Sequence, residues 1–219
     1  MGVDYIYFET LPQVQAHLIV NTVLTFLATG CVCLRIVTRF MSGARLWWDD
    51  YLIIASVPQG IGMLVLQGMY SKVGVGYPIT ETLPNLKVIL QMLVAYELIF
   101  SVAISTIKLS VMMFYLRVFV NQGLRLAVKL VMAFVGLWSL GNILQVFLIC
   151  RPFAATYDPL VKGECGNQVA SFIAIGAFNV VTDVLILTLP IRTVWGLSMS
   201  VPAKVGLTGV FLIGLMQSP

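Results

Sequence analysis

Long apolar stretches separated by short polar segments make up most of this sequence. Crossing about 30 Å of hydrocarbon as an α-helix takes about 20 mostly apolar residues. Five stretches reach that length and are predicted to be membrane-spanning helices: residues 17–37, 50–70, 88–116, 128–150 and 169–191. A sixth apolar stretch, residues 205–216, would reach only about 18 Å as a helix. We expect this last piece to be half of a span or a re-entrant segment.

The composition indicates that lipid is the main solvent of this chain. Apolar residues make up 59% of its 219 residues and charged residues only 10%, whereas soluble domains carry roughly 25% charged residues. Too few charged groups are present to cover a water-exposed surface, so a soluble globular protein is excluded. The predicted fold is an all-α transmembrane bundle that forms one domain over residues 1–219, with the lipid bilayer as its partner.

Several classes of function lack their sequence signatures. The net charge of +4 comes from basic residues scattered singly, so no nucleic-acid partner is expected. One histidine and four cysteines show no metal-ligand spacing, and the motifs of nucleotide binding, dinucleotide binding and hydrolysis are missing. We therefore expect no metal and no cofactor, while the identity of any protein partner stays open.

Basic residues near the helix ends predict the orientation of the chain. With the N-terminus outside, eight Lys and Arg residues are cytoplasmic and four are not, which satisfies the positive-inside rule. Residues 1–16 contain no Lys or Arg, so the first helix is expected to be an uncleaved signal anchor. The chain is thus predicted to be a multi-pass protein of the endoplasmic reticulum or the plasma membrane, with its N-terminus outside.

Cys150 and Cys165 flank the loop between the fourth and fifth predicted helices. The predicted orientation places this loop in an oxidising compartment, where disulfides persist. We expect a disulfide that closes a loop of about 15 residues and stabilises the fold by about 3 kcal/mol. Two free thiols are the alternative.

Ionisable residues inside the predicted spans are the candidate site residues, because a charge at the centre of a bilayer costs about 2.5 to 3.5 kcal/mol unless it finds a partner. On the third helix Glu97, Ser101, Ser105 and Lys108 follow spacings of four, four and three residues. These spacings place all four side chains on one helix face. That face must meet protein or water, so it is predicted to line the interior.

Lys108 and Asp183 are predicted to form an ion pair. Each lies nine residues before a basic residue at the cytoplasmic end of its helix, Arg117 and Arg192 respectively, so the two should lie at similar depth. Asn179 lies one turn from Asp183 on the same face. The pair either only docks the third helix against the fifth, or it forms part of a proton or ligand site.

Glu97 is predicted to lie nearer the other side of the membrane, beneath the loop that contains the two cysteines. Within a cavity there it would act as a general acid or serve only as polar lining. Two further pairs of polar residues are cavity candidates, each pair on one helix face: Asn21 with Thr25, and Asn142 with Gln145.

Asp49 and Asp50 begin the second predicted helix at its cytoplasmic end. Carboxylates at this position favour the positive end of the helix dipole, so capping explains at least one of them. Their neighbours Trp47 and Trp48 are typical of an aromatic belt at the membrane interface. We therefore interpret these four residues as a helix cap and an interface anchor.

Several segments in a fixed order resemble the fungal rhodopsin-like integral membrane proteins, a family of seven-helix proteins. The resemblance covers most of the chain and rests on WWDDYLIIASV (47–57), IKLSVMMFYLRVF (107–119), CRPFAATYDPLVKGECGN (150–167), FNVVTDVLILTLPIRTVWGL (178–197) and KVGLTGVFLIG (204–214). It implies an N-outside fold and a disulfide in the loop between the fourth and fifth helices. It also implies recurrent positions at Asp49, Asp50, Lys108, Asn179, Asp183 and Pro190.

Two departures from the family pattern stand out. After the second helix the family has a glycine-rich segment that ends in histidine, where this chain has Tyr77 and Pro78. The chain also ends before the family's seventh helix, so it is expected to be C-terminally truncated relative to the family.

The resemblance implies two kinds of function, because some family members look like orphan receptors and others belong to secondary-metabolite gene clusters of the mycotoxin type. Our leading hypothesis is a protein that binds or processes a hydrophobic small molecule in such biosynthesis. It would be an accessory or cyclase-like component, with Glu97 and Asp183 as candidate catalytic carboxylates. The alternatives are a receptor-like sensor and an inactive, truncated family member.

Overall fold

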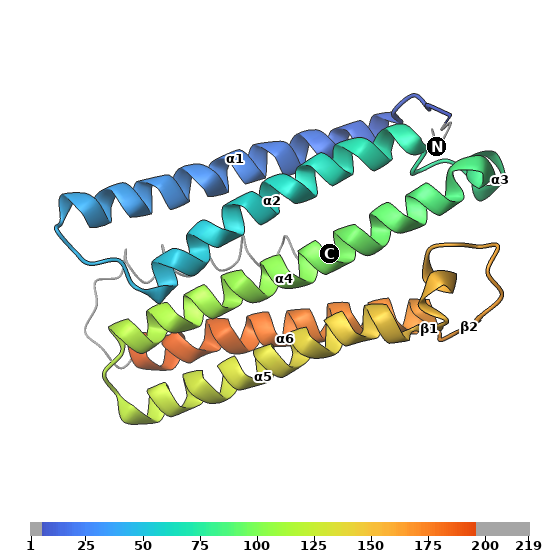
Figure 1. Cartoon of the computed structure of the whole chain (residues 1–219). Coiled ribbons are helices and arrows are strands. Elements are labelled where there is room, and N and C mark those ends of the chain that lie inside the picture. The colour runs from blue at the N-terminus through green and yellow to red at the C-terminus, as the bar shows by residue number, and fades with distance from the viewer. Residues whose placement is uncertain (1–5, 196–219) are drawn as a thin grey trace.

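The computed structural model describes residues 6–195, and within them each of the five long helices runs antiparallel to the long helix before it (Figure 1). Each is long and apolar enough to cross a membrane, which confirms the predicted all-α bundle with five spans. The predicted piece at 205–216 lies outside the described residues. The long helices are α1 (Pro12–Met41), α2 (Trp48–Val73), α4 (Leu86–Val118), α5 (Gln122–Leu148) and α6 (Gln168–Trp195).

Four of the five helices extend beyond the predicted apolar stretches at both ends. An apolar run reports only the part of a helix in hydrocarbon, whereas the helix continues into the polar interface until a capping residue ends it. At the start of α1, the fixed φ angle of Pro12 already suits the first turn of a helix. Gly74 ends α2 with φ +109°, a left-handed conformation that glycine adopts without steric cost.

The predicted helix 128–150 is wrong at its C-terminal end, because α5 stops at Leu148 and the chain enters a short strand. Strands β1 (Cys150–Arg151) and β2 (Glu164–Cys165) pair antiparallel, with Cys150 opposite Cys165. The predicted disulfide joins these two residues. Between the strands lies the 3-10 helix η2 (Phe153–Thr156). We call this part of the bundle the disulfide end.

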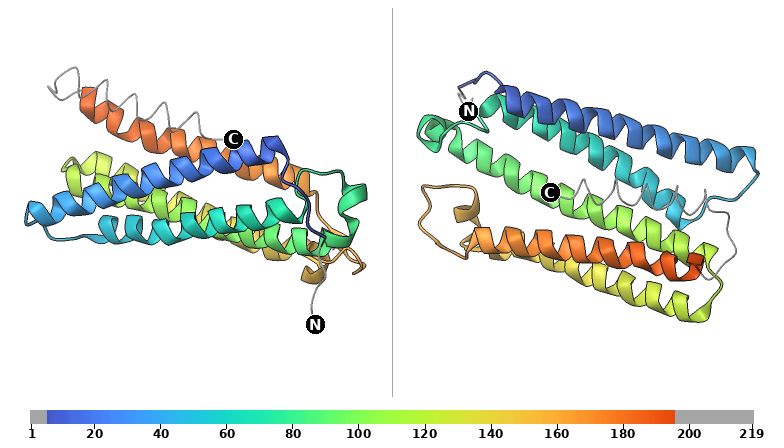
Figure 2. Two further views of the ribbon diagram at one scale, coloured as in Figure 1. Left: turned by 90° about the horizontal axis from the view of Figure 1, so that it is seen from above. Right: turned by 180° about the vertical axis from the view of Figure 1, so that it is seen from behind.

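Two short elements connect α2 to α4 at the disulfide end: α3 (Ile79–Thr82) and the 3-10 helix η1 (Leu83–Asn85). In the right view of Figure 2 the long α4 lies along the middle of the bundle, and it packs against α2 on one side and α5 on the other. The opposite end of the bundle, where α1 ends and α2 begins, is called the arginine end below.

The protein core is small and lies towards the arginine end. Its buried apolar cluster joins Met112 and Tyr115 of α4, Val128 and Val135 of α5, and Ile186 of α6. Helix α1 has no buried residue, although its sequence is strongly apolar. Such an arrangement is expected when lipid covers the outer face of a bundle.

The segment that precedes α1 crosses the disulfide end and is held there by two side chains. The buried amide of Asn85 donates hydrogen bonds to the carbonyl oxygens of Ile6 at 2.7 Å and Val73 at 2.9 Å. The hydroxyl of Tyr77 donates to the carbonyl of Glu9 at 2.9 Å. Tyr77 is one of the two positions where the sequence departs from the family pattern, and here it anchors this segment.

Candidate functional site

A cavity of about 380 Å³ lies at the disulfide end, between α4, α5 and α6 and beside η2. Its walls are mostly apolar, with side chains such as Phe100 and Phe172. Polar groups enter it from four elements: Glu97 from α4, Gln145 from α5, Thr156 from η2, and Gln168 and Ser171 from α6. The cavity therefore combines an apolar interior with a few polar groups, which is typical of sites for small molecules.

Glu97 is the acidic residue in the wall of this cavity. This agrees with its predicted position beneath the loop that contains the two cysteines. Within residues 6–195 no side chain or backbone group forms a hydrogen bond or ion pair with its half-buried carboxylate. The buried hydroxyl of Thr156 also lacks a hydrogen-bond partner in this part of the chain. Two polar groups of the cavity are therefore free to bind another molecule.

A second polar centre surrounds Lys108, deeper in the bundle. Its Nζ lies 3.0 Å from Asp183 Oδ1, which confirms the pairing predicted from depth. The same ammonium donates to Asn179 Oδ1 and Thr182 Oγ1, both at 2.6 Å. It also lies 5.5 Å from the centre of the Trp138 ring, within cation–π distance. Trp138 was not predicted, because depth alone does not say which neighbouring side chains turn inward.

The polar stripe on α4 divides between these two centres. Ser101 lines the cavity next to Glu97, whereas Ser105 shares a 2.7 Å hydrogen bond with the hydroxyl of Ser139 on α5. Ser101 and Ser105 are both buried, so the predicted inward face is confirmed. Lys108 then connects α4 to α6 through the contacts described above.

The two candidate acids are separated in the structure. Glu97 lines the cavity, whereas Asp183 lies outside its lining and is paired with Lys108. Eleven residues separate Glu97 from Lys108 on α4, about 16 Å along the helix axis. A single bound molecule at the cavity therefore meets Glu97 and not Asp183.

Asp49 and Asp50 form the centre of a buried ion cluster at the arginine end, with exposed fractions of 1% and 0%. Arg35 contacts both carboxylates, with Nη2 2.7 Å from Asp49 and Nε 3.0 Å from Asp50. Arg39 and Arg117 approach both at 3.6 to 3.7 Å. These arginines were not predicted as partners, because capping already accounted for the two carboxylates.

The predicted cap is present as well, and the two tryptophans face outward. Asp50 accepts a hydrogen bond from the backbone N–H of Trp47 at 3.3 Å, as part of a capping box. Trp47 and Trp48 are 54% and 71% exposed, which fits the predicted interfacial belt. Ser110 of α4 donates to the Asp49 carbonyl at 2.7 Å, so the start of α2 is tied to α4.

Of the two further candidate pairs, only the one on α5 lies near the cavity. Gln145 lines it, and Asn142 is buried one turn away with an amide nitrogen that has no partner in the described part of the chain. Asn21 instead donates to the side-chain oxygen of Gln67 at 3.1 Å and joins α1 to α2. Thr25 donates to the Asn21 carbonyl within its own helix.

The polar chemistry of the cavity comes from a carboxylate, hydroxyls and amides. In residues 6–195 no group of three or more His, Cys, Asp or Glu side chains lies together in a way that would hold a metal ion. The free cysteines Cys31 and Cys33 face outward on α1. The functional groups available to a bound molecule are therefore an acid–base group and neutral hydrogen-bonding groups.

Five helices able to span a membrane, with charged groups turned inward, define a multi-pass α-helical membrane protein. Residues 34–218 match the model of the fungal rhodopsin domain, and the chain belongs to this family.

Two relatives are similar in sequence. The polyenoic acids biosynthesis gene cluster protein Ba17b of Metarhizium anisopliae is 30% identical over 92% of this chain and 56% of its own length. A SAT4 family membrane protein of Emericella nidulans is 34% identical over 55% of this chain and 32% of its own length. The chain thus spans about half, or less, of the relatives that it matches. No solved structure matches it significantly.

Proposed function

We propose that this protein binds or processes a hydrophobic small molecule at the Glu97 cavity, as an accessory or cyclase-like component of secondary-metabolite biosynthesis. The observation that carries the proposal is a largely apolar cavity of about 380 Å³ with a carboxylate that no described residue binds. Its volume lies within the range of small-molecule sites, about 300 to 1,000 Å³. The name of the Metarhizium relative, from a polyenoic acids gene cluster, supports the metabolic setting. Neither relative is named for a mycotoxin, so we do not extend the proposal to that class.

The apolar and polar residues of the cavity would bind different parts of the molecule. The apolar walls would take the hydrocarbon part of the molecule, while Thr156 and Gln145 would orient a polar group at the disulfide end. Glu97 would accept a hydrogen bond or transfer a proton to a reacting oxygen, shielded from bulk water by the walls. A cyclase-like reaction would depend on Glu97 alone, because Asp183 is held by Lys108 outside the cavity.

The test is deletion of the gene followed by metabolite profiling and complementation. The deletion strain should lose or stall a hydrophobic compound, which the unchanged gene restores. Glu97→Gln keeps the size of the side chain but cannot transfer the proton in the same way, so it should fail to restore the compound. Glu81→Gln removes an exposed carboxylate on α3 and should restore it. Full restoration by Glu97→Gln would contradict a role for the carboxylate.

A receptor-like sensor is the second candidate, and one hydrogen-bonded chain favours it. Tyr96 lines the cavity and accepts a hydrogen bond from Gln67 at 3.1 Å, and Gln67 in turn bonds to Asn21 on α1. A ligand that contacts Tyr96 would therefore bias the packing of α4 against α2 and α1. This function predicts a G-protein subunit that copurifies with the protein and is lost in Gln67→Leu. A normal metabolite profile in the deletion strain would favour it over the biosynthetic role.

A further inference from the structure

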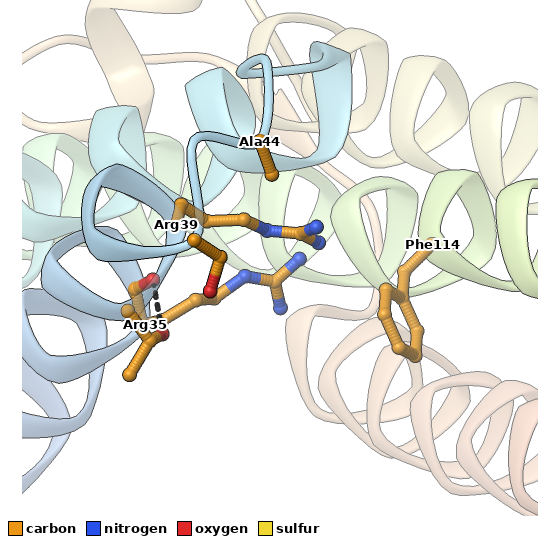
Figure 3. Close-up of a pocket in the computed structure, with 6 residues that line it drawn as sticks. Arg35, Arg39, Ala44 and Phe114 are labelled. Carbon is orange, nitrogen blue, oxygen red and sulfur yellow. Dashed lines mark hydrogen bonds between the residues drawn. The ribbon is translucent and has the colours of Figure 1, made fainter.

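An open pocket of about 330 Å³ lies at the arginine end, far along the bundle from the Glu97 cavity. It is lined by Arg35, Thr38, Arg39, Ser42, Ala44 and Phe114. Figure 3 shows the guanidinium groups of Arg35 and Arg39 side by side, with the ring of Phe114 across from them. The pocket therefore presents two cationic groups on the same wall.

The charge around this pocket does not balance. Three arginines, Arg35, Arg39 and Arg117, surround the two carboxylates of Asp49 and Asp50. Three positive charges thus face two negative ones, and one positive charge is left over. The C-terminal end of α1 and the N-terminal end of α2 meet here, and the dipoles of these two helices oppose each other. An anion that enters the pocket would complete the balance.

The hydrogen-bond donors are also divided unequally between the two arginines. Arg35 uses Nε and Nη2 on the carboxylates, at 3.0 and 2.7 Å. The contacts of Arg39 with the same carboxylates, at 3.6 and 3.7 Å, are too long for hydrogen bonds. The planar fork of Arg39 therefore keeps N–H groups for another acceptor, and the hydroxyl of Ser42 lies in the same wall. An arginine fork next to a hydroxyl suits a phosphate group.

The position of the pocket favours a phosphate that belongs to a lipid. Trp47 and Trp48 lie at the same end of the bundle and are exposed, and tryptophan concentrates at the level of lipid headgroups. Basic pockets at this level bind anionic headgroups. We propose that Arg39, supported by Arg35 and Ser42, binds the phosphate of an anionic phospholipid in the leaflet at the arginine end.

The test measures lipid binding by the purified full chain in detergent, with native mass spectrometry as the readout. The probes are a short-chain phosphatidic acid, a short-chain phosphatidylcholine and inorganic phosphate. The chain should bind phosphatidic acid at least about tenfold more tightly than either other probe. Arg39→Ala should weaken this binding by about tenfold, the effect of losing a charge-assisted hydrogen bond. The matched control, Arg45→Ala, removes an exposed arginine outside the pocket and should change binding by less than about twofold.

Three results would overturn the proposal: equal binding by Arg39→Ala and the unchanged chain, equal losses in Arg39→Ala and Arg45→Ala, or inorganic phosphate bound as tightly as the lipid. The second result would mean diffuse surface charge, and the third a soluble phosphate site. If Arg39→Ala does not fold, Arg39→Lys decides the outcome, because it keeps the charge beside the two carboxylates but lacks the fork. Binding weakened by a few-fold in Arg39→Lys supports the site, and unchanged binding refutes it.

Discussion

Replacing Lys108 by methionine tests whether the deep ion pair holds α4 against α6. The side chain of Lys108 is 7% exposed, and its ammonium has four oxygen atoms within 3.1 Å. Its removal leaves the carboxylate of Asp183 without a cation. Breaking a buried pair costs about 3 to 5 kcal/mol, and a lone carboxylate at the centre of a span costs about 2.5 to 3.5 kcal/mol. Because Asp183 is 31% exposed, we expect the low end, about 3 kcal/mol.

The double variant Lys108→Met with Asp183→Leu separates the pair from its surroundings. Apolar replacement of both charges is often neutral or stabilising, but the side-chain oxygen of Asn179 loses its donor, which costs about 1 kcal/mol. The neutral double variant should therefore be about 2 kcal/mol more stable than Lys108→Met. Exchange of the charges, Lys108→Asp with Asp183→Lys, should be worse than the neutral double variant. In the exchange a carboxylate would face the oxygen atoms of Asn179 and Thr182 that now bind the ammonium.

Thermal unfolding of the purified chain in detergent, followed by circular dichroism, measures these differences. With a shift of about 2 to 4 °C per kcal/mol for a chain of this length, Lys108→Met should lower the melting temperature by about 6 to 12 °C. The neutral double variant should lower it by only about 2 to 4 °C. Lys129→Met, at an exposed position on α5, is the control and should shift it by less than about 2 °C. A double variant that melts no higher than Lys108→Met would refute the conclusion that the unpaired carboxylate of Asp183 causes the loss.

Three further outcomes are expected. Serine at both Cys150 and Cys165 should lower the free energy of unfolding by about 3 kcal/mol, because the loop that the disulfide closes regains its freedom in the unfolded chain; an unchanged melting temperature would contradict this. The hydrogen bond from Lys87 holds the pKa of Asp158 below its ordinary value of 3.8. This contact should stabilise the loop above about pH 3.8 and be lost only as the pH falls through the lowered pKa of Asp158. The rate at which an acid protease cleaves the loop at different pH values measures this loss. A glycosylation sequon introduced at residues 159–161 should be glycosylated if the N-terminus is outside. If only a sequon placed between α4 and α5 is glycosylated, the predicted orientation is wrong.

The five spans could be predicted because hydrocarbon thickness imposes a minimum length on any apolar helix. Their ends could not, because interfacial residues such as Trp48 and Arg117 are compatible with helix and with loop alike. The strand pair that contains Cys150 and Cys165 was also missed. Two-residue strands carry no periodic pattern, and this pair is defined by contacts between segments that the sequence alone does not bring together.

The sequence predicted how deep in the membrane the candidate site residues lie, but not which helix faces meet around them. Counting residues to the helix ends was sufficient to pair Lys108 with Asp183, since depth follows from the rise per residue. Which faces of neighbouring helices meet depends on packing, so Trp138 was missed. The arginine cluster did leave a signal, because Arg35 and Arg39 lie four residues apart on one face of α1. Only a short connection separates them from the carboxylates at the start of α2.

Some polar groups of the bundle hold helices together and others do not. This difference distinguishes Glu97 as a functional residue. The ammonium of Lys108 and the carboxylates of Asp49 and Asp50 have partners on neighbouring helices, so docking of helices accounts for them. Glu97 joins no described helix to another and borders an apolar cavity. Groups kept at a cost in stability are typical of functional sites. Glu97→Leu should therefore keep or raise the melting temperature while it abolishes complementation, and a lower melting temperature would instead give Glu97 a structural role.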